Sequence, residues 1–116
     1  MKQILVIIAA AAVLAPLSAY AQERMSDARY LAANQCLAYA DLTDLQGDPV
    51  NFSALREAVE VGNRERSITA QVRQNTRSIR ARATTASVEQ LRSRRDQACT
   101  RFVERGLVQL GGSGAS

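Results

Sequence analysis

Ser26–Leu45, with the sequence SDARYLAANQCLAYADLTDL, is a stretch whose apolar residues recur at helical spacing. Ser26 is a favoured residue for the N-cap of a helix. Gly47 and Pro49 follow the stretch and are typical of a helix end. The pattern predicts one long first helix with one buried face, polar only at Gln35 and widened by Cys36 and Tyr39. The face is formed by Ala28, Leu31, Gln35, Ala38, Leu42 and Leu45.

The rest of the chain also has helical patterns and no strand-like alternation. A second region begins near Asn51 or Ser53 and carries heptad-like apolar positions at Ala54, Ala58, Val61, Ile68, Val72, Ile79 and Ala86. Gly62 is either a kink in one long helix or a turn between two helices. Ser87 and Gln90 predict a capping box before a last helix, whose apolar side holds Val88, Leu91, Ala98, Cys99, Phe102 and Val103. We therefore predict a small all-α, up-down bundle of three helices, or four if Gly62 breaks the middle region.

Two cysteines, Cys36 and Cys99, support this arrangement. Each falls near the middle of a predicted helix, one in the first and one in the last. An even pair in an exported chain is typical of a disulfide. We predict one inter-helix disulfide, Cys36–Cys99, which requires the outer helices to be neighbours.

The N-terminal residues have the pattern of an export signal. Lys2 precedes an apolar run over residues 3–15, and Ala19 and Ala21 are the small residues of a cleavage site. The run, about 13 residues, is too short to span a bilayer. We predict a cleaved signal peptide over residues 1–21, a helical domain over 22–110 and a flexible tail over 111–116. The predicted location is the bacterial periplasm or the medium.

Charge is divided unevenly along the predicted mature chain. Residues 22–62 hold 3 Arg and 7 acidic residues, whereas residues 63–116 hold 11 Arg and 4 acidic residues. Arg66, Arg73, Arg77 and Arg80 step by seven, four and three residues, so they share one side of a helix. This arginine stripe is either a binding surface for an acidic protein or a polyanion, or a face that is solvated or neutralised by the acidic first helix.

Several kinds of function are disfavoured by the residues present. The chain has no histidine, and its two cysteines do not form a Cys-x-x-Cys pair, so we predict no enzyme and no cofactor. Asp41, Asp44 and Asp48 match no EF-hand spacing and are expected to pair with arginines rather than hold calcium. Nucleic acid is a poor candidate partner because no aromatic residue for base stacking lies between residues 52 and 102.

One short segment carries a resemblance to a known family. Leu91-Arg92 followed by Arg95-Asp96-Gln97-Ala98-Cys99 resembles the end of small secreted lysozyme-inhibitor-like domains. The two pieces are closer together than in that family, and its tryptophan and additional cysteines are absent. Within this segment Arg95 interrupts the apolar side of the last helix, where it either reaches solvent or pairs with an acid of the first helix.

The leading functional hypothesis is a non-enzymatic module that binds another protein of the cell envelope. A second hypothesis is a binder of anionic surfaces, such as lipopolysaccharide or phospholipid, through the arginine stripe. A lysozyme-inhibitor-like or secretion-system accessory protein is a further alternative. A homodimer through the seam at Asn75 is another, since a lone polar residue in such a seam fixes its register.

Overall fold

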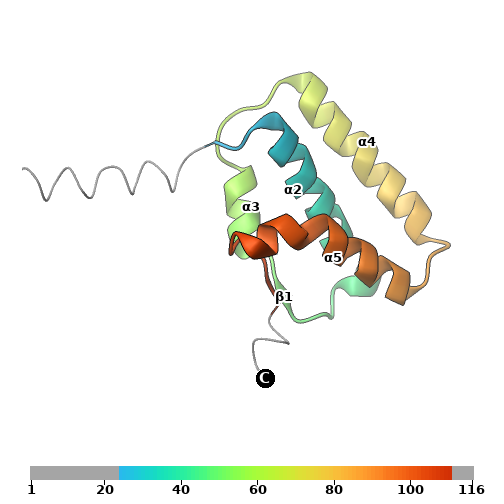
Figure 1. The fold of residues 1–116 in the computed structure, drawn as a ribbon. Helices are drawn as coiled ribbons and strands as arrows, with labels where there is room; N and C mark the ends of the chain where they lie inside the picture. Colours follow the sequence, from blue (N-terminus) through green and yellow to red (C-terminus); the bar gives the residue numbers. More distant parts are fainter. Residues whose placement is uncertain (1–23, 111–116) are drawn as a thin grey trace, which may run out of the picture.

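The computed structural model describes residues 24–110, and in this range the chain is mostly helical (Figure 1). The elements in chain order are α2 (Asp27–Ala40), η1 (Thr43–Leu45), β1 (Val50–Asn51), α3 (Ser53–Val59), α4 (Arg66–Ala83), α5 (Val88–Glu104) and β2 (Gln109–Leu110). The predicted helical fold is therefore confirmed, with four α-helices in this range. The predicted signal peptide, 1–21, and the predicted tail, 111–116, lie outside the described residues. Among the helices of residues 24–110, none has the length and apolarity needed to cross a membrane.

Helix α2 begins where the sequence predicts but ends sooner. The Ser26 hydroxyl accepts a hydrogen bond from the backbone N–H of Arg29 at 3.2 Å, which confirms the N-cap. The helix stops at Ala40 because Leu42 is extended, with φ −63° and ψ 135°. The prediction of one helix through Leu45 was therefore wrong. The helix break and the 3₁₀ turn η1 redirect the chain, and Leu42 and Leu45 are buried from this turn rather than from α2.

The predicted buried face of α2 was also partly wrong. Gln35 and Ala28 are exposed, whereas the five consecutive residues Cys36–Ala40 are all buried. The reason is that α2 contacts three other helices, α3, α4 and α5. A helix enclosed on several sides has no single apolar stripe, so three-to-four-residue spacing does not identify its core positions.

Gly62 lies in a turn that separates α3 from α4. Its φ of +81° is in the left-handed region, which a glycine adopts without the steric cost that a Cβ imposes. The turn settles the helix count at four rather than three. It also changes the core of the middle region, because Leu55 is fully buried while the predicted core residue Ala54 is exposed.

The side chain of Arg64 links the connection between α3 and α4 to the first turn of α2. Its side chain is only 2% exposed, and one guanidinium nitrogen, Nη1, lies 2.8 Å from Oδ1 of Asp27. The guanidinium carbon lies 4.3 Å from the centre of the Tyr30 ring, a cation–π distance. Its Nε and Nη2 are buried without a hydrogen-bond partner in the part of the chain that the structure describes. The connection is thus fixed by one ion pair and one aromatic contact.

Two apolar clusters make up the core. The first joins α2, α3, α5 and the C-terminal segment, and it contains Ala33, Cys36, Leu37, Leu55, Cys99, Phe102 and Val108. The second joins the end of α2 with η1, α4 and α5, and it contains Ala38, Tyr39, Leu42, Leu45, Ile79 and Leu91. The predicted Cys36–Cys99 disulfide is present in the first cluster, with the two Cα atoms 5.0 Å apart. It confirms that α2 and α5 are neighbours.

Both ends of α5 follow well-known capping patterns. Ser87 and Gln90 form the predicted capping box, with two reciprocal hydrogen bonds of 3.1 Å. At the other end Gly106 has φ +79°, and the N–H groups of Leu107 and Gly106 donate to the carbonyls of Phe102 and Val103. This Schellman motif reverses the chain. As a result, Val108 enters the first cluster and is 1% exposed.

Because the chain turns back at Gly106, its segment after α5 forms a small sheet that the sequence pattern did not predict. Strands β1 and β2 pair antiparallel, with Val50 opposite Leu110 and Asn51 opposite Gln109. Each strand has only two residues, which is too short to show alternation. The sheet joins the segment before α3 to the segment after α5.

Candidate functional site

The arginine stripe lies on the exposed side of α4. Arg66, Arg73, Arg77 and Arg80 are all exposed, as predicted, and the 18-residue helix contains a fifth arginine, Arg82, and no acidic residue. None of these five side chains forms an ion pair with another residue in 24–110. The opposite side of the helix holds Ile79, which is buried against α2 and α5. The helix therefore packs through Ile79, and its five arginines carry positive charge that no ion pair within residues 24–110 offsets.

Three acidic residues of the first half of the chain, Asp27, Asp41 and Asp48, pair with arginines outside the stripe. Asp27 contacts Arg24 and Arg64, whereas Asp41 accepts hydrogen bonds from Arg56 at 2.6 and 3.5 Å. These ion pairs join the carboxylates to α3, to α5, to the segment before α2 and to the α3–α4 connection. Within residues 24–110, no ion pair joins the acidic first segment to the stripe.

Asp48 is the centre of the largest charged network. Its carboxylate accepts hydrogen bonds from Arg92 Nε and Nη2 at 2.9 and 3.0 Å and from Arg95 Nη1 at 2.6 Å. These bonds, first from Arg92 and then from Arg95, hold the pKa of Asp48 below its usual value despite partial burial. The same pairing raises the pKa of Arg92. The network attaches the loop before β1 to α5.

The Asp48 network explains why Arg95 lies on the apolar side of α5. The Arg95 side chain is 7% exposed, and it also contacts Asp96 at 3.0 Å. The segment that resembles lysozyme-inhibitor-like domains lies within α5, where its residues Leu91, Arg95 and Cys99 are buried and the others face outward or are partly covered. In this chain those three residues serve packing and the internal ion network.

Residues 24–110 contain no candidate site for a metal ion. Asp41 and Asp48 bind different arginines, and residues 24–110 contain no group of three or more acidic or cysteine side chains placed to hold a metal ion.

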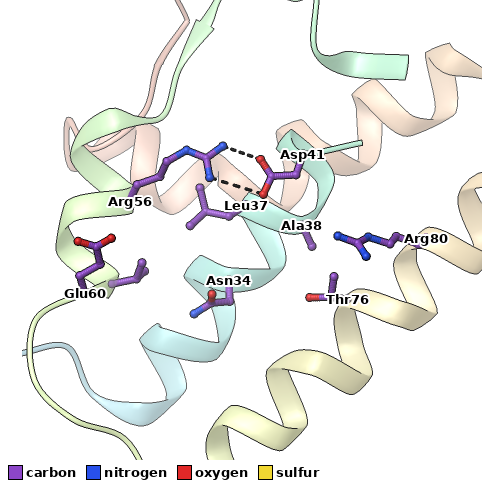
Figure 2. A pocket seen from close by; sticks show the side chains of 9 residues that line it. Asn34, Leu37, Ala38, Asp41, Arg56, Glu60, Thr76 and Arg80 are labelled. Atoms are coloured by element: carbon purple, nitrogen blue, oxygen red, sulfur yellow. Dashed lines mark hydrogen bonds and ion pairs between the residues drawn. The ribbon is translucent and has the colours of Figure 1, made fainter. Parts of the chain in front are cut away.

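One cavity lies next to the arginine stripe, between α2, α3 and α4 (Figure 2). It has a volume of about 270 Å³, and it is open to solvent. Leu37, Ala38 and Val59 supply apolar surface, and the polar lining residues are Asn34, Asp41, Arg56, Glu60, Thr76 and Arg80. Figure 2 shows Arg80 directed from α4 toward Ala38 of α2, with Thr76 beside it. Arg80 is the member of the stripe that lines this cavity.

A second cavity, of about 250 Å³, lies beside the two-stranded sheet. Its lining is mainly apolar and includes Val50, Phe52, Val103 and Val108, together with Arg95 of the Asp48 network. No arginine of the stripe lines it. The two cavities therefore differ in chemistry, and only the first adjoins the stripe.

The sequence analysis missed a second row of arginines. Arg94, Arg101 and Arg105 are exposed and step by seven and four residues along α5 and its C-cap. We refer to them as the second arginine row. Their spacing is the same signal that identified the stripe, but the adjacent paired residues Arg92 and Arg95 obscured it in the sequence. None of the three forms an ion pair inside the range 24–110.

Asn75, the residue at the centre of the predicted homodimer seam, is half-buried in α4. The neighbouring seam residue Ile79 packs against Tyr39 and Leu91 of the same chain. This part of the seam is occupied by intramolecular packing.

No protein-family model, no curated protein and no solved structure matches the chain.

Proposed function

We propose that this chain is a non-enzymatic interaction module of the bacterial cell envelope, exported to the periplasm or the medium. It binds an acidic surface of another envelope protein through the arginine stripe of α4. The disulfide-bonded cysteine pair is compatible with an oxidising compartment and so supports this location.

The observation that carries the proposal is the absence of internal counterions for the stripe. Arg73 and Arg77 are four residues apart and Arg77 and Arg80 three apart, spacings at which like charges cost a helix about 0.2–0.5 kcal/mol per pair. Arg66 lies in the first turn, where the helix dipole disfavours a cation. Five other arginines of residues 24–110 do have carboxylate partners, so the fold can supply them; they are Arg24, Arg56, Arg64, Arg92 and Arg95. An acidic partner would relieve the repulsion within the stripe.

The test is a double charge reversal, Arg73→Glu/Arg77→Glu, compared with Arg101→Glu/Arg105→Glu on α5. The two variants have the same net charge, and all four positions are exposed, so both should remain folded. The α5 variant should be the less stable of the two, because Arg101 and Arg105 lie at the C-terminal end of α5, where the helix dipole favours a cation. Tagged parent and variants are used to capture proteins from the native envelope fraction at low and high salt. The proposal expects one stoichiometric protein that the α4 variant loses and the α5 variant retains.

A second candidate function, binding of an anionic surface, is favoured by the second arginine row. A polyanion responds to the total positive charge of both helices, so both double variants should weaken its binding to a similar extent. Its affinity should also fall steeply with salt. Binding to vesicles of anionic phospholipid or to lipopolysaccharide, measured with the same variants, separates the two candidates. Equal loss in both variants without a protein partner would replace the first proposal with the second.

A further inference from the structure

The cavity between α2, α3 and α4 contains one guanidinium without an internal partner. Arg56 and Arg80 both line the cavity. Arg56 is held by Asp41 through two nitrogens, as the dashed lines in Figure 2 show. The guanidinium of Arg80 has no hydrogen bond or ion pair to any residue in the described part of the chain. The donors of Arg80 are therefore open to a ligand.

The chemistry of Arg80 selects a carboxylate. A guanidinium has five N–H donors in a planar fork that fits the two oxygens of a carboxylate. The rest of α4 strengthens this preference, because the helix has five arginines and no acidic residue. The hydroxyl of Thr76 lies on the same wall, one turn before Arg80, and can donate a further hydrogen bond.

The other walls of the cavity limit what can accompany that carboxylate. Leu37, Ala38 and Val59 offer apolar surface suited to a short aliphatic stem. Glu60 lies on the opposite side of the opening from Arg80 (Figure 2), so its negative charge favours placing a bound carboxylate at the Arg80 end of the cavity. The volume, about 270 Å³, is below that of a typical site for a drug-sized ligand, about 300–1,000 Å³. These features fit one carboxylate on an aliphatic stem.

We infer that this cavity receives a single glutamate or aspartate side chain of the partner protein, with its carboxylate bound by Arg80. This inference rests on the proposed function and identifies the point at which the partner is anchored. The remaining arginines of the stripe attract the partner's acidic surface, and Arg80 fixes its register through the cavity. Arg80 therefore differs from Arg66, which has the same charge but lies at the far end of α4, away from the cavity.

The test uses a small probe in place of the partner. N-acetyl-glutamate α-amide carries one carboxylate on an aliphatic stem, and N-acetyl-glutamine α-amide is its uncharged match. Each is titrated into the ¹⁵N-labelled full chain, and amide and arginine side-chain NMR shifts are followed. The expected result is saturable shifts at Thr76, Arg80 and Asn34 with the glutamate probe. Arg80→Gln should weaken this binding by about tenfold or more, whereas Arg66→Gln should leave it unchanged.

Three outcomes would overturn the inference: equal binding of the glutamine probe, equal loss in the two arginine variants, or no saturable shift at the cavity. The proposed function is tested separately by the reversal of Arg73 and Arg77. If that reversal abolishes partner capture while the probe fails to bind, the stripe docks the partner without the cavity. If the probe binds at Arg80 while capture survives the reversal, the cavity site stands and the proposed function falls.

Discussion

Removal of the Cys36–Cys99 disulfide should destabilise this domain about as much as the most damaging truncation of a core side chain. The two cysteines are separated by 63 residues. The chain-entropy model gives a loss of about 14 cal/mol/K for a closed loop of that length, or about 4 kcal/mol at 25 °C. A single domain has a net stability of about 5–15 kcal/mol, so the bridge supplies a large share of it.

The assay is urea and thermal unfolding followed by circular dichroism. The oxidised parent is compared with Cys36→Ala/Cys99→Ala and with the reduced parent, which loses the bridge but keeps both sulfur atoms. The free energy of unfolding should fall by about 4 kcal/mol in both cases. For a domain of this size that corresponds to a melting temperature lower by about 16–32 °C.

The comparison of the two bridge-free proteins isolates the physical cause. Cys36 and Cys99 are buried, so the alanine variant also loses packing and should be somewhat less stable than the reduced parent. A fall of less than about 1 kcal/mol in the reduced parent would refute the loop-closure argument. A large fall confined to the alanine variant would assign the stabilisation to packing.

Three further predictions concern the charged network and a turn. Arg95→Met should lower the free energy of unfolding, measured by urea denaturation, by about 2–3 kcal/mol. The loss is smaller than for a fully broken buried ion pair because Asp48 keeps its ion pair with Arg92. An unchanged free energy of unfolding would contradict the network's structural role. The pKa of Asp48 is lowered by folding, so its contribution is complete above the ordinary carboxyl value of about 3.9 and is lost as the pH falls below it. Stability measured against pH should therefore decline in acid, and Asp48→Asn should flatten part of that decline; parallel curves would argue against this assignment. Gly106→Ala should lower the free energy of unfolding, measured by thermal unfolding, by about 1–2 kcal/mol. Only the positive φ contributes to this loss, because a Cβ at Gly106 meets no atom within 4 Å. An unchanged free energy would show that the turn adapts.

Features encoded by neighbouring residues could be predicted from the sequence. The caps at Ser26 and Ser87 depend on hydrogen bonds across three residues, and both were located correctly. The disulfide followed from having two cysteines in a chain with a predicted export signal. The positions of the stripe arginines followed from helical spacing alone.

Features that depend on contacts between distant segments could not be predicted in the same way. The end of α2 was misplaced because Leu42 and Leu45 continue the helical spacing although they pack through a 3₁₀ turn. The two-stranded sheet depends on the turn at Gly106, which brings residue 110 back to residue 50. For the candidate site, the charges of α4 were visible in the sequence. The cavity beside Arg80 was not, because it exists only where α2, α3 and α4 meet.

The pairing of Cys36 with Cys99 and the burial of Val108 have a consequence for biosynthesis. A chain emerges from the ribosome N-terminus first, at about 5–20 residues per second, so Cys99 follows Cys36 by about 3–13 s. Throughout that interval α2 lacks the helix that covers it, and Cys36 remains an unpaired thiol. The core closes only when residue 108 has also been made. The domain therefore cannot complete its core while residues 99–108 are missing, and the apolar surface of α2 stays exposed to aggregation until they are present.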